Sequence, residues 1–183
     1  MVSRRLIAVA ALGLQACSHT VAVERLEMAL AARDSATAAL RDWCEWRGIA
    51  NPARISARAV RGDDAPPPPS LAEELAVPAG EPTGYRHVRL SCGGAVLSEA
   101  HNWYVPARLT PEMNRLLTET DTPFGTVAAP LAYRRERLGS TPGQGPGCPA
   151  GTVLTHRARL ILPDGKPLAL LVECYTLANL SRT

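Results

Sequence analysis

The spacing of apolar residues is helical in the first part of the chain. Residues 21–46 are rich in Ala, Leu, Glu and Arg, and their apolar side chains recur at intervals of three and four positions. The polar triplet Arg33, Asp34 and Ser35 interrupts this pattern. We therefore expect one helix to end at this triplet and a second helix to begin at Asp34 or Ser35.

From Tyr85 onward the apolar residues follow a period of two, which is typical of strands. Two strands, 85–92 and 95–105, are predicted on either side of Gly93 and Gly94, a dipeptide that suits the positive φ angles of a tight hairpin. Pairing Cys92 with Ala95 would set Arg86 opposite His101 and Val88 opposite Glu99. The polar residues before Trp103 would then point toward an arginine on the apolar face of the first strand.

A second hairpin is predicted at strands 153–162 and 168–176, with Asp164-Gly165 as its two-residue turn. In this register His156 lies opposite Glu173, Leu160 opposite Ala169, and Ala158 opposite Leu171. Glu173 thus falls on an otherwise apolar strand face. Because a lone carboxylate in such a place needs a partner or a raised pKa, we expect a pKa above that of a free glutamate, or an ion pair with Arg86.

Shorter signals divide the rest of the chain. They predict a polyproline spacer (66–69), a short helix (71–75) with a capping box of Ser70 and Glu73, a helix capped by Thr110 and running to Thr118, a turn (121–125), a strand (127–138) and a Gly/Pro-rich loop (139–151). The chain has no internal repeats, and its 183 residues fit one domain.

Charge and composition exclude some classes of partner. Hydrophobic residues make up 46% and charged residues 20%, as in ordinary globular proteins. The net charge of +3 falls to +1 without Arg4 and Arg5, and the arginines are scattered, so a nucleic-acid partner is not expected. No metal or cofactor motif is present, and we expect neither a metal nor a cofactor.

The first residues have the order of an export signal. A basic stretch (1–5) precedes an apolar run (6–14) that is too short to span a bilayer, and Gln15, Ala16 and Cys17 end it in a sequence that resembles a bacterial lipobox. We expect a signal peptide (1–16), lipidated Cys17 within a tether and helix start (17–37), and a domain at 38–183. The protein would be a membrane-anchored lipoprotein of the cell envelope facing the periplasm. The alternative is a cytoplasmic protein translated from Met28.

Export would bring four further cysteines, Cys44, Cys92, Cys148 and Cys174, into an oxidising compartment, where an even number permits disulfides. Their spacings match no zinc-binding pattern, and the sequence leaves the connectivity open.

The stretch YRHVRLSCGGAVLSEAHNWYVPARLTPEMNRLLTETDTPFG and the hairpin RARLILPDGKPLALLVECYT resemble the chorismate lyase (chorismate pyruvate-lyase) family. The likeness covers roughly residues 38–178 and is greatest to lyase-like members with the motifs NWYVP and DTPFG. It implies an α+β fold: a single antiparallel sheet of about six strands with flanking helices and an internal site for an aromatic ligand.

The resemblance also implies an activity, the elimination of pyruvate from chorismate to give 4-hydroxybenzoate without a cofactor. It makes Arg86 and Glu173 catalytic and substrate-binding residues, with Arg86 clamping a carboxylate and Glu173 binding the ring hydroxyl. Further substrate contacts fall on Phe124 and Trp43. Asn102 stands where some family members have a second arginine.

We expect the lyase reaction first, with non-catalytic binding of hydroxybenzoate-like aromatic acids at the envelope as the alternative and a purely structural lipoprotein third. Export and the replacement of an arginine by Asn102 favour the binder, whereas Arg86, Glu173 and the DTPFG turn favour the lyase. His87 is the alternative to Arg86 if the register is counted back from Cys92. In both cases the partner is a small aromatic or enolpyruvyl carboxylic acid, and we expect a monomer.

Overall fold

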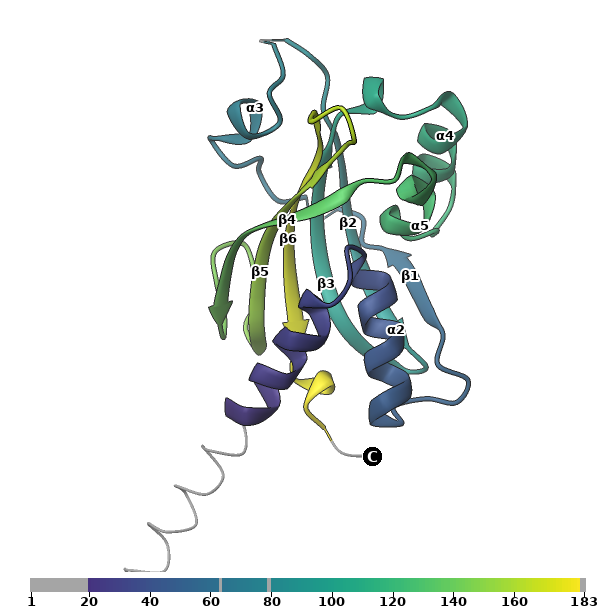
Figure 1. Cartoon of the computed structure of the whole chain (residues 1–183), viewed down its shortest axis with the longest axis vertical. Coiled ribbons are helices and arrows are strands. Elements are labelled where there is room, and N and C mark those ends of the chain that lie inside the picture. The colour runs from purple at the N-terminus through teal and green to yellow at the C-terminus, as the bar shows by residue number, and fades with distance from the viewer. Residues whose placement is uncertain (1–19, 63, 79, 182–183) are drawn as a thin grey trace, which may run out of the picture.

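A computed structural model of the chain describes residues 20–62, 64–78 and 80–181. It has an α+β fold in which one antiparallel sheet of six strands carries helices on both faces (Figure 1). This architecture is the one that the sequence predicts.

The sheet has the order β1-β2-β3-β6-β5-β4, so the two predicted hairpins meet at its centre through the pairing of β3 with β6. The strands are β1 (Ile55–Ala59), β2 (Gly84–Cys92), β3 (Ala95–Tyr104), β4 (Arg134–Pro142), β5 (Thr152–Ile161) and β6 (Pro167–Thr176). The edge strand β1 is missing from the sequence prediction.

The helices begin and end close to the predicted caps. They are a first helix whose described part spans 20–31, α2 (Ala36–Arg47), α3 (Leu71–Glu74), α4 (Pro111–Glu119) and α5 (Phe124–Ala128), with 3-10 turns η1 (Pro106–Arg108), η2 (Ala129–Leu131) and η3 (Leu177–Asn179). Ser35 caps α2 by accepting a hydrogen bond from the Ala38 amide, and Thr110 caps α4 in the same way through Met113.

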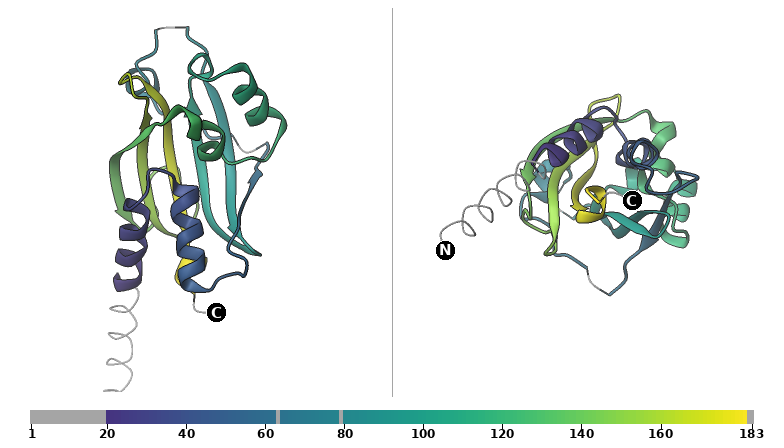
Figure 2. Two further views of the ribbon diagram at one scale, coloured as in Figure 1. Left: turned by 45° about the vertical axis from the view of Figure 1, so that its right-hand side comes forward. Right: turned by 90° about the horizontal axis from the view of Figure 1, so that it is seen from below.

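Two groups of helices cover one face of the sheet. The first helix and α2 pack over one end of it, and α4 with α5 pack over the other end (Figures 1 and 2). The opposite face is covered by α3 and by the segment 143–151, which pack against Trp103, Leu170 and Val172. The two helical groups meet over the middle of the first face, and this junction positions the candidate site.

The predicted register of the second hairpin is confirmed, because His156 pairs with Glu173 and Leu160 with Ala169. The predicted register of the first hairpin is wrong by one residue. Arg86 pairs with Asn102 rather than with His101, since Leu90 pairs with Ser98 while Ser91 pairs with Val96. This irregularity adds one residue, Leu97, to β3 and buries it completely in the core.

Two other sequence predictions are wrong. Residues 124–131 form α5 and η2, and the strand that follows starts only at Arg134 and continues into the predicted loop as far as Pro142. Ser70 forms no capping box with Glu73, because its hydroxyl donates to Glu74 instead.

Two disulfides fasten the layers. Cys44–Cys92 joins α2 to the end of β2, and Cys148–Cys174 joins the segment 143–151 to β6 on the opposite face. Among the described residues, no helix has the length and apolar character needed to span a bilayer. The predicted signal peptide and Cys17 lie outside the described residues.

Candidate ligand-binding site

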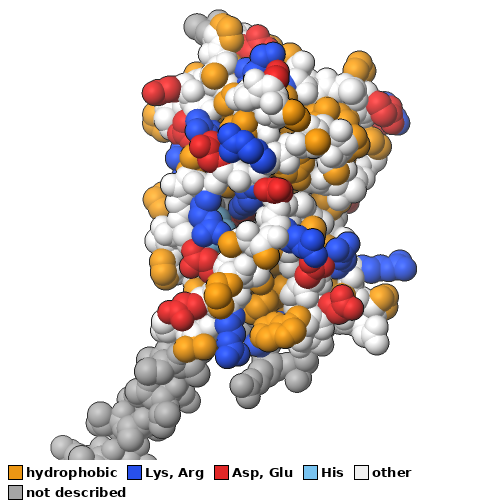
Figure 3. Space-filling view, viewed as in Figure 1, with side chains coloured by type: hydrophobic (Ala, Val, Ile, Leu, Met, Phe, Trp, Pro, Cys, Tyr) orange, Lys and Arg blue, Asp and Glu red, His pale blue; other side chains and the backbone are white. Residues whose placement is uncertain are grey.

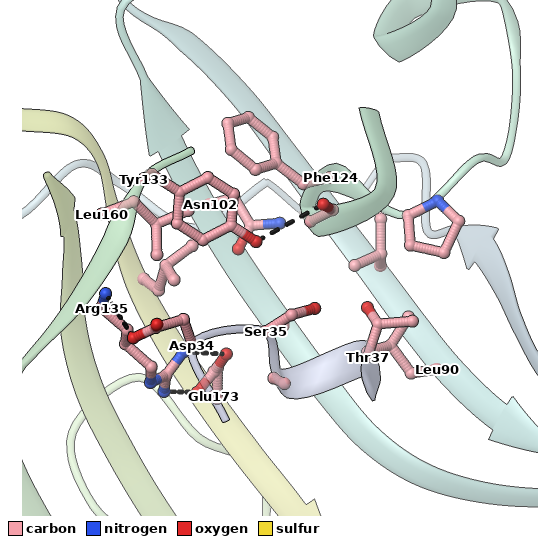
Figure 4. Close-up of a pocket in the computed structure, with 16 residues that line it drawn as sticks. Asp34, Ser35, Thr37, Leu90, Asn102, Phe124, Tyr133, Arg135, Leu160 and Glu173 are labelled. Carbon is pink, nitrogen blue, oxygen red and sulfur yellow. Dashed lines mark hydrogen bonds and ion pairs between the residues drawn. The ribbon is translucent and has the colours of Figure 1, made fainter. Parts of the chain in front are cut away.

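A small cavity of about 40 Å³ lies between the sheet and the junction of the two helical groups. Apolar side chains form most of its wall: Val88, Leu90, Ala100, Pro123, Phe124, Leu160 and Leu171. Polar groups of Ser35, Asn102, Tyr133, Arg135 and Glu173 also line it, and Figure 4 shows these side chains converging from α2, β3, β4, β6 and the residues before β4. An apolar chamber with a few convergent polar groups is the usual form of a small-molecule site.

Asn102 places a side-chain amide in the wall of this cavity. Its side chain is 5% exposed and lines the cavity from β3, and its amide forms no hydrogen bond with the described residues. A buried amide without a partner costs roughly 1–3 kcal/mol. It therefore offers a donor and an acceptor to a molecule inside the cavity.

Glu173 is tied to a guanidinium in the cavity wall. Arg135 donates to both carboxylate oxygens of Glu173, through Nη1 at 3.1 Å and through Nη2, and the Tyr175 hydroxyl donates to Oε2 at 2.9 Å. Burial alone would raise the pKa of Glu173, but Arg135 and the Tyr175 hydrogen bond outweigh burial and hold this pKa below its usual value. The expectation of a raised pKa is thus wrong, and the ion-pair partner is Arg135 rather than Arg86.

His156 lies beside this pair. Its side chain is 1% exposed, and its ring meets that of Tyr175 edge to face with centroids 5.2 Å apart. Burial lowers the pKa of His156 to about 4, so the ring is neutral at pH 7. Its Nε2 atom has no hydrogen-bond partner among the described residues.

A narrow contact separates the cavity from a larger outer groove of about 640 Å³. Both are lined by Asp34, Ser35, Thr37, Gly125 and Tyr133. Gly125 permits this closure, because a Cβ at that position would lie 2.9 Å from the Ser35 hydroxyl and 3.1 Å from the Tyr133 hydroxyl. Movement of α5 against the start of α2 would join the two spaces.

Charge is distributed unevenly between the two spaces. Arg135 and Glu173 neutralise each other in the inner cavity, and Asp34 adds a negative charge at its rim. The outer groove adds Arg41 and Arg54, of which Arg41 already pairs with Asp42. On the face seen in Figure 3 acidic and basic side chains alternate, so no broad field of one sign guides a ligand there.

Arg86 lies on the cavity side of β2 but does not line the cavity. Its guanidinium donates to the carbonyl oxygens of Thr122 at 2.8 Å and Thr120 at 3.0 Å, and so holds the link between α4 and α5. Burial lowers the pKa of Arg86. The structure therefore separates Arg86 from Glu173 and places its guanidinium at the segment 120–122, outside the cavity wall.

Of the other residues expected in the site, some line the cavity and others lie away from it. Glu173, Phe124 and Asn102 come together around the cavity, whereas Trp43 is buried in the core under α2, where its indole donates to the Asn179 carbonyl at 3.3 Å. His87 points to the opposite face of the sheet, since it alternates with Val88 along β2. Arg135 is absent from the sequence prediction, and its signal was only the basic end of the segment expected as a strand.

Comparison with known proteins gives one relative and a set of similar folds. The chain is 39% identical over 173 residues to the uncharacterized protein y4mC of Sinorhizobium fredii, and the match covers 84% of this chain and 73% of the relative. The chain belongs to the y4mC family. No protein-family model matches the sequence.

Several solved structures have a fold similar to that of this y4mC-family chain. PhnF of Mycobacterium smegmatis has a TM-score of 0.57 at 15% identity, covering 82% of this chain and 67% of PhnF. The effector domain of PhnF has a TM-score of 0.54 at 17% identity, covering 79% and 89%. The ligand-binding domain of a Bordetella bronchiseptica regulator assigned to the GntR family has a TM-score of 0.50 at 17% identity, covering 68% and 83%. These likenesses show a shared fold.

Proposed function

We propose that this domain binds a small aromatic carboxylic acid without turning it over. The observation that carries the proposal is the buried amide of Asn102, which faces an apolar cavity and lacks a partner among the described residues. The shared fold supports it, because one of the similar structures is described as a ligand-binding domain. In such a site a few fixed polar groups orient a ligand whose apolar part fills the chamber.

The charges favour one orientation of the ligand. The inner cavity has no unneutralised cation, so the aromatic ring and a hydroxyl group enter it and the hydroxyl bonds to Asn102. The carboxylate stays in the outer groove beside Arg54, an exposed arginine. A cavity that holds benzene has a volume of about 150 Å³, so the inner space of about 40 Å³ must widen at the Ser35–Gly125 contact on binding.

Calorimetry with 4-hydroxybenzoate and with its uncharged amide, 4-hydroxybenzamide, tests this arrangement. Asn102→Leu should weaken both ligands by about 1–3 kcal/mol, because the buried hydroxyl loses its partner. Arg54→Gln should weaken the acid and leave the amide unchanged. Asn114→Ala is the control, because Asn114 lines neither the cavity nor the outer groove. The proposal is wrong if the wild-type chain binds neither ligand saturably, or if Asn102→Leu binds both as well as wild type.

The second candidate is the lyase reaction. Its supporting observation is that Glu173 and Arg135 stand together in the cavity wall, within reach of a bound enolpyruvyl acid. Glu173 would have to leave Arg135 and Tyr175 to assist a proton transfer, which favours the binder. Pyruvate release from chorismate, followed by a coupled assay, decides between the two. Release by wild type that disappears in a Glu173→Gln variant shown by circular dichroism to be folded would establish the lyase.

We also propose export and lipidation at Cys17, with the domain facing the periplasm. Two disulfides support this location, because they persist in oxidising compartments. Labelling of cells with a radioactive fatty acid should mark the wild-type protein and not Cys17→Ser. Equal labelling of the two would refute lipidation, and a native N-terminus at Met28 would refute export.

A further inference from the structure

A histidine–glutamate cluster lies on the face of the sheet opposite the cavity. His87 of β2 pairs directly with His101 of β3, and Glu99 lies two residues before His101, so all three side chains project from the same side. One potential ligand atom from each lies within 4.8 Å of the other two. The side chains of His87 and Glu99 are 1% and 13% exposed, and His101 is 5% exposed, so the cluster is buried with an opening at Glu99.

We propose that His87, Glu99 and His101 bind a divalent transition-metal ion. Two imidazoles and one carboxylate are a donor set suited to zinc and its neighbours. Metal–ligand bonds of about 2.0–2.2 Å place tetrahedral ligand atoms roughly 3.4 Å apart. The more distant ligand atoms, at up to 4.8 Å, therefore have to approach by no more than about 1.4 Å, and His87 Nε2 and Glu99 Oε1, at 2.8 Å, have to separate by about 0.6 Å. The fourth position would face the opening and take water or an exogenous ligand.

Neighbouring groups already orient two of the three side chains. Arg89 donates from Nε to Glu99 Oε2 at 2.7 Å, which leaves Oε1 directed at His87 Nε2, 2.8 Å away. The Tyr85 hydroxyl lies 2.8 Å from His101 Nδ1 and accepts from the Ala65 amide at 2.9 Å. Bonds of this kind to the far atoms of ligands fix their tautomer and orientation in metal sites.

Binding of the ion replaces one hydrogen bond of the metal-free protein, which joins His87 Nε2 to Glu99 Oε1. The ion takes the position of the proton between these atoms, and both atoms become ligands. The displaced proton is balanced by one on Nδ1 of the same ring, so the ring coordinates as neutral imidazole. His101 contributes one of its ring nitrogens.

The alternative is a purely structural network in which the same residues only tie β2 to β3. The two readings differ in a measurable way, because a structural network has no saturable affinity for a metal. The proposal is independent of the ligand cavity, which lies across the sheet and is lined by alternate residues of the same strands.

Titration of the full metal-free chain with Zn²⁺ and Co²⁺ is the test. Calorimetry should give saturable binding of one ion per chain. Bound Co²⁺ should give the intense visible absorption of a four-coordinate site. The proposal is overturned if wild type shows no saturable binding of either ion.

Variants locate the site. His87→Gln, Glu99→Gln and His101→Gln should each weaken Zn²⁺ more than about 100-fold, whereas Tyr85→Phe should weaken it about 10- to 100-fold, as loss of a supporting bond does. His156→Gln, a buried histidine on the opposite face, is the matched control and should bind as wild type. Near-ultraviolet circular dichroism checks that each variant folds. Equal Zn²⁺ affinity of wild type and any folded ligand variant would also overturn the proposal.

Discussion

Removing the charge of Glu173 should destabilise the protein strongly, because it leaves Arg135 charged and buried. The side chains of the pair are 5% and 9% exposed. Both carboxylate oxygens of Glu173 accept hydrogen bonds, one from Arg135 and the other from both Arg135 and Tyr175. In Glu173→Gln the NH₂ group replaces one of these oxygens, so a donor then faces a donor. Breaking one side of a buried ion pair costs about 3–5 kcal/mol. For a chain of this length that loss lowers the melting temperature by roughly 6–20 °C.

The matched control is Glu136→Gln, which breaks an Arg–Glu pair of the same type at the surface. Arg159 donates to Glu136 at 2.9 Å, and the two side chains are 26% and 36% exposed, so solvent screens the pair and its loss should cost about 0–1 kcal/mol. Urea unfolding of both variants with intact disulfides gives the two free energies. The reasoning is refuted if Glu173→Gln costs no more than Glu136→Gln. Replacing both buried partners by apolar residues, as Arg135→Met with Glu173→Leu, should recover most of the loss.

Three further predictions concern other parts of the fold. The pKa of His156 is about 4 in the folded chain and 6.5 in the unfolded chain, so the unfolded state binds more protons between these two pH values. The free energy of unfolding should therefore fall by up to about 3 kcal/mol as the pH drops from 6.5 to 4. Urea titrations at several pH values should show that His156→Gln removes most of this pH dependence. Replacing Cys44 and Cys92 by Ala opens a loop of 48 residues and should cost about 4 kcal/mol, measured by denaturant unfolding; a cost below 1 kcal/mol would contradict the loop-entropy account. Arg86→Met should lower the free energy of unfolding by about 2–4 kcal/mol, because the Thr122 carbonyl loses a charged hydrogen-bond donor. Hydrogen exchange of the backbone amides near Thr122 should become faster. Unchanged exchange there would show that Arg86 does not hold this segment.

The second hairpin could be predicted from the sequence because two local signals agree. The Asp164-Gly165 turn fixes the loop length, and the strict alternation of the strands fixes the register, so the pairing of His156 with Glu173 follows. In the first hairpin the turn is equally clear, but the added residue Leu97 shifts every later pair. Its insertion is decided by burial under α2, a tertiary effect with no local sequence mark.

The candidate site could be predicted only where one strand face was enough. Glu173 was found because a carboxylate stands out among apolar neighbours of its own strand. Arg135 could not be chosen, since Arg134 and Arg137 lie in the same basic run. The pairing of β4 with β5 puts both Arg135 and Arg137 on the cavity side, and of the two only Arg135 lines the cavity. Asn102 was noted as a departure from a family pattern; its lack of a partner became visible in three dimensions.

The two edges of the sheet limit how copies of this chain can associate. The edge strand β1 has five residues and carries Arg58, and the other edge strand, β4, begins at Arg134, has an irregular register after Arg137 and ends at Pro142. Charge, short length, a local bulge and proline all oppose the addition of a strand from another molecule. Sheet-to-sheet extension, the usual route from an exposed edge to aggregation, is thus blocked on both sides, and any contact between copies has to be made by helices and loops.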